Sequence, residues 1–253
     1  MPLIVHSKST EKFIDDWTYD RTMLVRDKPD KHIADLENTE NIVIAIGGGS
    51  VIDTAKILCR NPAIAVPTTF SGASRTKHAV YWYHGRKINI NTKKPITICK
   101  PEYQETLPKE IRNYSLCDCL CHAIEASISN RTTKLSDYCA RMSIELLGKN
   151  KPADSLNASF LAGDAIEITG TNVIHALSYP ITSLYGISHG KALAFLLPRV
   201  VNYLYDREIE VQFLENVELD INIEKVIDEA LTYKKIYESR RLVNKRILME
   251  LLK

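Results

Sequence analysis

The chain has 253 residues, of which 45% are hydrophobic and 25% charged, proportions that exclude a disordered, collagen-like or coiled-coil protein. Its formal net charge of +2 implies no broad basic face for nucleic acid or an anionic membrane. No run approaches the roughly 18 apolar residues of a membrane span. Residues 1–13 become polar and charged too early for a secretory signal, and six cysteines are too few for a disulfide scaffold. We therefore expect a cytoplasmic protein without nucleic acid or a membrane as partner.

Short β-rich runs alternate with helical stretches in the first half of the chain. The patterns predict strands at 22–26, 41–46, 63–66 and 95–99, a helix at 51–60, and a hairpin over 79–90. The runs at 41–46 and 63–66 are continuously apolar, which is typical of parallel strands buried on both faces. This alternation predicts an α/β domain over residues 1–110.

The pattern changes from about Leu107 onward, where strand-like runs disappear. Helical periodicity is present at 116–129, 136–148, 155–179 and 189–204, and the charged stretch 223–253 also has few helix breakers. We therefore expect an all-helical domain over residues 111–253.

A glycine-rich turn follows the apolar run at 41–46. Gly47, Gly48 and Gly49 lack the Cβ atoms that would keep a ligand away from the backbone, and the helix N-terminus after them favours a pyrophosphate. Ser50 and Asp53 have the S-x-x-D spacing of a helix cap. Because the motif is not G-x-G-x-x-G, a tight strand-to-helix connection without a ligand is the alternative.

Four residues of the helical half have the chemistry of metal ligands. Asp118 and His122 are four residues apart, on one face of a predicted helix, and His175 and His189 follow much later. One carboxylate and three imidazoles suit Fe²⁺ or Zn²⁺. Taken singly, each of these histidines is more often a structural residue than a ligand.

Three cysteines, Cys117, Cys119 and Cys121, lie in the same segment as the predicted Asp/His pair. Their spacing distributes them around a helix instead of placing them on one face. We therefore expect buried or half-buried thiols and not a thiolate metal site.

In combination these motifs resemble the iron-containing (group III) alcohol dehydrogenases, relatives of glycerol dehydrogenase and dehydroquinate synthase. The match is carried by residues 47–56, 118–125 and 175–190, in that order. The string His-Ala-Leu-Ser-Tyr-Pro-Ile-Thr-Ser at 175–183 is similar to a branch that includes phosphonoacetaldehyde reductases. The resemblance implies a dinucleotide-binding α/β domain and an all-helical metal-binding and catalytic domain, as in dehydroquinate synthase.

The same resemblance implies NAD(P)-dependent reduction of a small aldehyde, or the reverse oxidation of an alcohol, with Fe²⁺ or Zn²⁺ as the metal. It is compatible with a homodimer. A metal-dependent lyase or hydrolase, and a shortened homologue without catalytic activity, are the alternative functions.

The resemblance assigns roles residue by residue. The implied metal ligands are Asp118, His122, His175 and His189, and the implied cofactor-binding residues are Asp27, Gly47, Gly48, Gly49, Ser50, Asp53, Thr68, Thr69 and Lys87. Asp27 would face the adenosine ribose hydroxyls and repel a 2′-phosphate, which favours NAD, with NADP as the alternative. A second interpretation of Asp27 is a cap on the turn into Lys28 and Pro29.

The chain departs from the family in length and at one position near the metal ligands. The segment between Asp27 and the glycine turn is short, and the helical half is truncated after Pro198. Tyr179 stands where many members carry a second histidine, one helical turn after His175. Its phenol is a candidate proton relay, although a group with a pKa near 10 is a weak donor unless a metal or cation lowers that pKa. Packing or substrate orientation is the alternative role.

Overall fold

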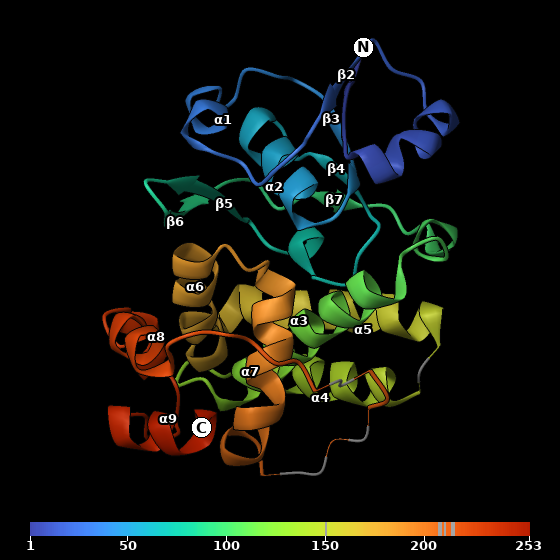
Figure 1. Cartoon of the computed structure of the whole chain (residues 1–253). Coiled ribbons are helices and arrows are strands. Elements are labelled where there is room, and N and C mark those ends of the chain that lie inside the picture. Colours follow the sequence, from blue (N-terminus) through green and yellow to red (C-terminus); the bar gives the residue numbers. More distant parts are fainter. Residues whose placement is uncertain (150, 207–208, 210, 214–215) are drawn as a thin grey trace. The chain divides into compact units, whose positions relative to one another are not determined.

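The computed structural model describes residues 1–149, 151–206, 209, 211–213 and 216–253. The chain divides into two compact units, Met1–Leu107 and Pro108–Lys253. The first unit is drawn in blue to green in Figure 1, and the second in green to red. The α/β architecture followed by a helical region is as predicted, and each unit is described below by itself.

A parallel five-stranded sheet forms the centre of the first unit, with strand order β2-β1-β3-β4-β7. The strands are β1 (Leu3–His6), β2 (Arg21–Leu24), β3 (Val43–Gly47), β4 (Ile64–Pro67) and β7 (Ile96–Thr97). Strand β1 was not among the predicted strands, yet it pairs with both β2 and β3: Leu3 lies opposite Arg21 on one side and Val43 on the other. Parallel pairing buries these short apolar runs on both faces of the sheet.

Alternate residues of the strands supply two separate cores. On one face, Val5 and Ala45 pack with Ile52 and Leu58 of helix α2 (Gly49–Leu58). On the other face, Ile4, Ile44 and Ile46 belong to a core that includes Ile14, and Phe13, from the same 3-10 helix Lys8–Asp16, packs against it. This alternation follows from the two-residue period of a strand and holds the end of β3, where the glycine turn begins, in a fixed position.

The shortened segment before the glycine turn contains helix α1 (Lys31–Asp35), whose N-cap Asp30 accepts a hydrogen bond from the Ile33 N–H. The predicted hairpin is formed by β5 (His78–Tyr83) and β6 (Arg86–Asn91). Its two-residue turn contains His84 and Gly85, both with positive φ. This backbone twist matches that of the two strands, as is usual in tight hairpins.

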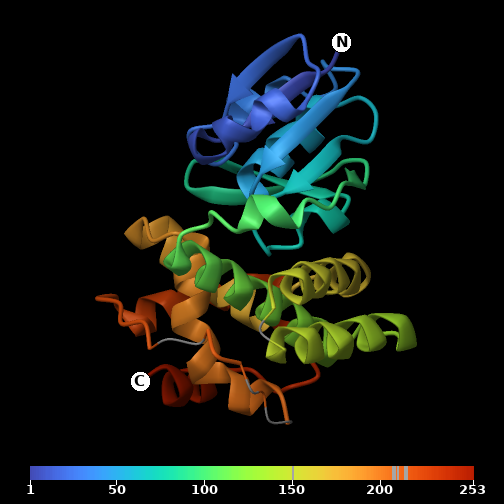
Figure 2. The same cartoon turned by 90° about the vertical axis from the view of Figure 1, so that its right-hand side faces the viewer.

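The second unit is helical throughout its described elements, as expected. Its α-helices are α3 (Lys109–Ile128), α4 (Lys134–Gly148), α5 (Pro152–Thr169), α6 (Val173–Tyr185), α7 (His189–Leu204), α8 (Ile223–Ala230) and α9 (Lys245–Leu252). Helix α3 is the central element and contacts α4, α5, α6 and α7. Figure 2 shows the green α3 beside the yellow-green α4 and the yellow α5. Among the helices of the described residues, none is long and apolar enough to cross a membrane.

Two predicted helical stretches are interrupted in the structure. The stretch 155–179 is divided at Gly170, whose positive φ ends α5, and Asn172 then caps α6 by accepting the Val173 N–H. The stretch 223–253 contains α8 and α9 separated by a fourteen-residue connection that includes the 3-10 helix Lys234–Tyr237. There the Arg240 N–H donates to the Ile128 carbonyl, so contact with α3 replaces helical hydrogen bonds. Predicted strand 95–99 is also shorter, with two residues in β7.

Candidate metal centre

The four predicted ligands of the helical unit lie together, although they come from three helices. Asp118 and His122 are on α3, His175 is on α6, and His189 is the first residue of α7. Asp118, His175 and His189 each offer a ligand atom within 4.8 Å of the others. His122 completes the cluster: its Nε2 lies 3.4 Å from Asp118 Oδ1, and its ring stacks on that of His175 with centroids 4.6 Å apart.

A fully buried carboxylate, Glu125, orients one of these imidazoles. Glu125 Oε2 accepts a hydrogen bond from His175 Nδ1 at 2.6 Å, and its Oε1 accepts the backbone N–H groups of Ile174 and His175. His175 Nε2 is thereby directed to Asp118 Oδ1, 3.2 Å away. A carboxylate behind a ligand histidine is a common arrangement at metal sites, because it fixes the tautomer and the ring orientation.

Glu125 was absent from the residues assigned functions by sequence, although the pattern contained a signal for it. It follows Asp118 by seven residues and His122 by three, so all three share one face of α3. It also stands between Ile124 and Ala126, both fully buried. A charged residue in such an apolar run needs a buried partner, and here the partner is His175.

The cluster is electrostatically suited to a cation. Burial raises the pKa of Asp118, but His122, His175 and His189 lower it more, so the pKa lies below its ordinary value. Burial lowers the pKa of His175, yet Glu125 and Asp118 raise it to about 9. The cluster therefore stabilises a positive charge, and a proton would compete there with a metal ion.

A glycine beside His189 allows α7 to approach α3 closely. A Cβ atom at Gly190 would lie 2.9 Å from the Cβ of Tyr114 and 3.5 Å from that residue's carbonyl carbon. His189 Nδ1 lies 3.3 Å from the hydroxyl of Ser178, which in turn donates to the His175 carbonyl. These contacts hold the His189 imidazole beside that of His175, with ring centroids 5.4 Å apart.

Tyr179 lies at the side of this cluster. It is buried on α6, and its ring centroid is 6.4 Å from that of His189. Its hydroxyl accepts a hydrogen bond from Lys235 Nζ at 2.8 Å, and its ring meets the edge of Tyr233. Lys235 lies 56 residues further along the chain, and no local sequence pattern marks it as a partner of Tyr179.

The three cysteines of α3 are buried and form no disulfide, as predicted. Burial raises the pKa of Cys119 to about 12, and its Sγ lies 3.7 Å from the hydroxyl of Ser143. Protonated thiols are poor metal ligands. The structure therefore agrees with a packing role for these residues.

The glycine turn of the first unit has a different helix cap from the expected one. Helix α2 begins at Gly49 with Gly48 as its N-cap, and no side chain makes a capping hydrogen bond. The predicted cap by Ser50 and Asp53 is wrong, because the helix starts early enough to place both residues within it. The Asp53 carboxylate instead accepts the Val80 N–H and pairs with Lys56 Nζ, each at 3.2 Å.

The packing of the chain itself disfavours a Cβ atom at two glycines of this turn, strongly at Gly47 and mildly at Gly48. A Cβ at Gly47 would lie within 2.6 to 2.9 Å of the Val51 side chain, and one at Gly48 would be 3.1 Å from Thr69 Cγ2. The Thr68 N–H donates to the Gly47 carbonyl at 3.0 Å. The structure thus brings the turn together with Thr68 and Thr69, an arrangement that fits both a ligand-binding turn and a tight connection.

The two remaining predicted cofactor residues, Asp27 and Lys87, lie outside the helix and turn at 47–58. Asp27 is exposed and follows the end of β2 by three residues; its carboxylate accepts the Lys28 N–H at 2.7 Å, as the turn-cap alternative expects. Lys87 lies on β6, opposite Trp82. Burial raises the pKa of Asp53, and Lys56 and Lys87 oppose that effect, which places Lys87 near this carboxylate.

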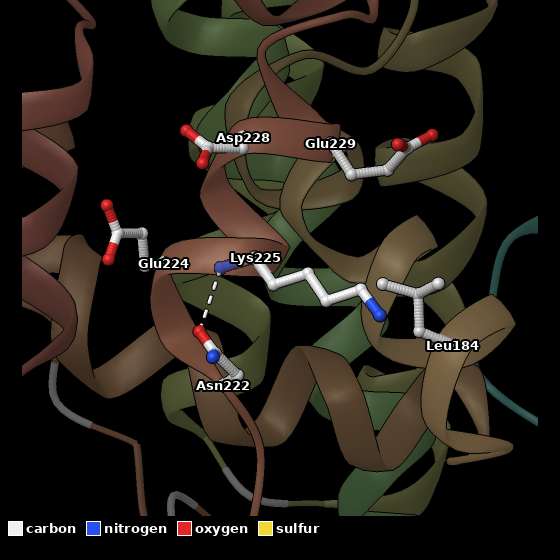
Figure 3. A pocket seen from close by; sticks show the side chains of 6 residues that line it. All are labelled: Leu184, Asn222, Glu224, Lys225, Asp228 and Glu229. Atoms are coloured by element: carbon white, nitrogen blue, oxygen red, sulfur yellow. Dashed lines mark hydrogen bonds between the residues drawn. The ribbon is translucent and has the colours of Figure 1, made fainter.

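Figure 3 shows the lining of a pocket of about 450 Å³ in the helical unit. It is lined by Leu184 of α6, by the α8 N-cap Asn222, and by Glu224, Lys225, Asp228 and Glu229 of α8. Glu224 and Asp228 already pair with Lys245 at 2.8 and 2.7 Å. None of the predicted ligands lines this pocket, so it is not a candidate for the metal centre.

Comparison with known families places the helical unit in one of them. Residues 113–239, just over half of the chain, match the model of the Fe-containing alcohol dehydrogenase family, C-terminal. The chain belongs to the iron-containing alcohol dehydrogenase family. The matched segment includes all four clustered ligands, Glu125, Tyr179 and Lys235.

Two further comparisons place this family member among its relatives. It is 28% identical over 229 residues to alcohol dehydrogenase 4 of Saccharomyces cerevisiae, covering 72% of this chain and 59% of that protein. The crystal structure of an iron-containing alcohol dehydrogenase from Thermotoga maritima superposes with a TM-score of 0.80 at 22% identity, covering 99% of this chain and 90% of that chain. The fold is therefore that of the family, while the chain spans under two thirds of the length of its yeast relative.

The sequence string at 175–183 led us to expect that phosphonoacetaldehyde reductases would be more similar to this chain than other family members are. The comparisons do not show this. The phosphonoacetaldehyde reductase of Streptomyces viridochromogenes is 27% identical over 209 residues, covering 64% of this chain and 53% of that protein. The yeast alcohol dehydrogenase is at least as similar over a longer stretch. The string at 175–183 is too short to define a branch of this iron-containing alcohol dehydrogenase family.

Proposed function

We propose that the chain is a metal-dependent, NAD(P)-linked alcohol dehydrogenase or aldehyde reductase that acts on a small aldehyde or alcohol. The observation that carries this proposal is the convergence of Asp118, His175 and His189, with Glu125 behind His175. Family membership supports the redox chemistry. The chain spans 59% of the length of its yeast relative, so both cofactor binding and catalysis by this chain belong to the proposal.

The donor set fits the metal that the family name implies. One carboxylate oxygen and imidazole nitrogens are suitable ligands for Fe²⁺ and for Zn²⁺, and the cluster already favours positive charge. Asp118, His122, His175 and His189 would hold the ion. When bound, it would supply Lewis-acid polarisation of the substrate oxygen.

The residues of this chain have separate tasks in such a reaction. Glu125 keeps His175 Nε2 directed towards Asp118, and Ser178 lies beside His189 Nδ1. Tyr179 would orient the substrate or pass a proton through its hydroxyl. In the first unit, the turn at Gly47–Ser50 would bind the cofactor pyrophosphate at the N-terminus of α2, with Thr68 and Thr69 beside it.

Anaerobic purification followed by metal analysis and an NADH and NADPH titration tests this function. We expect about one Fe²⁺ or Zn²⁺ per chain, binding of the reduced cofactor, and a fall in NADH absorbance when a small aldehyde is added. Bound metal without cofactor binding or NADH oxidation would favour a lyase or hydrolase. Absence of both metal and turnover would favour a homologue without catalytic activity.

A further inference from the structure

Lys235 connects the 3-10 helix Lys234–Tyr237 to the side of the metal centre. Its Nζ donates hydrogen bonds to Tyr179 Oη at 2.8 Å and to Thr171 Oγ1 at 2.7 Å. It also lies 4.9 Å from the centroid of the Tyr179 ring. The sequence interval between Lys235 and these partners exceeds 50 residues, so only the folded helical unit brings them together.

The polarity of this hydrogen bond determines where the Tyr179 hydrogen can point. A lysine ammonium has three donors and no acceptor, whereas a phenol hydroxyl can act as donor and acceptor. Tyr179 Oη must therefore accept from Lys235. Its own hydrogen is therefore directed away from Lys235.

The surroundings keep Lys235 charged and Tyr179 in place. Burial lowers the pKa of Lys235, but Tyr179, Glu125 and Glu238 raise it above its ordinary value, so the side chain is an ammonium at neutral pH. The Tyr233 ring meets the Tyr179 ring nearly at right angles, with centroids 5.5 Å apart. The phenol is thus fixed by a hydrogen bond at its oxygen and by packing on its ring.

We propose that Lys235 is a positioning residue that makes the Tyr179 hydroxyl a hydrogen-bond donor to the substrate oxygen at the metal centre. This inference rests on the proposed function, because it requires a carbonyl or alcohol oxygen to bind beside His189. Lys235 does not touch the substrate and acts through Tyr179. The competing explanation is that Lys235 only attaches the 3-10 helix to α6.

A double-mutant cycle distinguishes these explanations. The variants are Tyr179→Phe, Lys235→Met and their combination, with Lys234→Met as the matched control, because Lys234 is the exposed neighbour of Lys235. The first readout is the affinity of the Zn²⁺-loaded full chain for butyramide, an unreactive analogue of an aldehyde carbonyl, measured by calorimetry. The second is kcat and KM for butyraldehyde with NADH.

We expect Tyr179→Phe and Lys235→Met each to weaken butyramide binding about tenfold, and the double variant to be no weaker than either single one. Lys234→Met should leave the affinity within twofold. In the Tyr179→Phe background, Lys235→Met should change neither butyramide affinity nor KM. Additive losses, or wild-type affinity in Lys235→Met, would overturn the inference.

A second variant decides the matter if Lys235→Met does not fold, as judged by metal content and melting temperature. Lys235→Gln offers an acceptor that can capture the Tyr179 hydrogen, so butyramide affinity should fall at least as far. Retained affinity in a folded Lys235→Gln protein contradicts the inference. A wild-type protein that never oxidises NADH with an aldehyde overturns the proposed function instead, whereas an active wild type with an additive cycle overturns only the role of Lys235.

Discussion

The candidate metal centre of the helical unit is built from side chains, whereas the glycine turn of the α/β unit is built mostly from backbone. The centre consists of side chains, and its buried charges are arranged around Asp118 and His175. The turn consists mostly of backbone, and its glycines are explained in part by contacts with Val51 and Thr69. A carboxylate buried among imidazoles needs a positive charge nearby, which a proton or a metal ion can supply, whereas packing explains part of a glycine turn without any ligand.

This difference determines how each site can be tested. A site made of side chains is destroyed by shortening one of them, and the fold can survive because each helix has other contacts. A site made of backbone offers no functional group to remove, so it is blocked by adding atoms. The predictions below use both kinds of substitution, and each unit serves as the internal control for the other.

Replacing His189 with Ala should have the largest effect, which is loss of bound metal with the fold retained. The substitution removes one of the three converging ligands at the first residue of α7. Metal stoichiometry measured by mass spectrometry, together with circular dichroism, checks the result. His32→Ala, at an exposed histidine of α1, controls for metal held on the surface. Unchanged stoichiometry in His189→Ala would remove His189 from the ligand set.

Gly48→Val should abolish NADH binding while leaving the metal content unchanged. The added side chain would occupy the surface where a pyrophosphate approaches, and its Cβ would also crowd Thr69 at 3.1 to 3.2 Å. A fluorescence titration with NADH measures the loss, and a change of less than threefold in Kd contradicts the assignment.

Gly48→Val could lower NADH affinity either by blocking the cofactor or by crowding Thr69. The double variant Gly48→Ala with Thr69→Ser separates these two causes. Serine lacks the Cγ2 methyl nearest to the added Cβ but keeps the hydroxyl. If the turn binds pyrophosphate, NADH affinity should stay low in this variant. Recovery to the wild-type Kd would show that packing alone caused the loss.

Glu125→Gln should weaken metal binding by about 10- to 100-fold, the usual cost of losing a carboxylate behind a ligand histidine. The amide keeps much of the shape but removes the charge that faces His175 Nδ1 at 2.6 Å. Competition with a chelator measures the metal Kd. Glu110→Gln, an exposed position on the same helix, should leave the Kd unchanged. Equal effects of the two substitutions would mean that Glu125 does not act through His175.

Asp27→Gly should have the smallest effect, a rise of three- to tenfold in the use of NADPH relative to NADH, equivalent to about 0.7 to 1.4 kcal/mol. The carboxylate would otherwise bind the ribose hydroxyls and repel a 2′-phosphate. Comparison of kcat/KM for both cofactors checks this. Asp27→Asn keeps an acceptor for the Lys28 N–H, so a shift in both variants points to charge and a shift only in Asp27→Gly points to the turn.

The sequence predicted the fold class and the order of the metal-ligand segments because both depend on short-range patterns. Continuous apolar runs indicated β3 and β4, and the period of the later segments indicated helices. The non-helical stretch before Asn244 was missed because tertiary contacts such as Arg240 with Ile128 override local periodicity there. The break at Gly170 was missed although its signals are local, a glycine with positive φ and the Asn172 cap. Strand β1 was missed because its apolar run is only three residues long.

The parts of the site that escaped prediction are those that depend on distant pairing. Asp118 and His122 were visible as a helical pair, whereas the role of Glu125 requires the position of α6. Lys235 carries no local signal, since neither Tyr179 nor Thr171 is near it in sequence. For Ser50 and Asp53 a local signal was present but misleading. Their spacing matches a capping motif, yet the helix begins at Gly49 with Gly48 as its N-cap, so neither residue caps it.

If the proposed metal binds, the separation of its ligands along the chain would link the amount of this protein to the supply of that metal. Asp118 and His175 are 57 residues apart, so an ion bound between them would tie remote segments of the helical unit together. A ligand that binds only the folded form adds about 4.1 kcal/mol of stability at a thousandfold excess over its Kd. Cells short of the metal would then hold more of the opened chain, which proteases degrade first, and the abundance of the protein would report on metal availability.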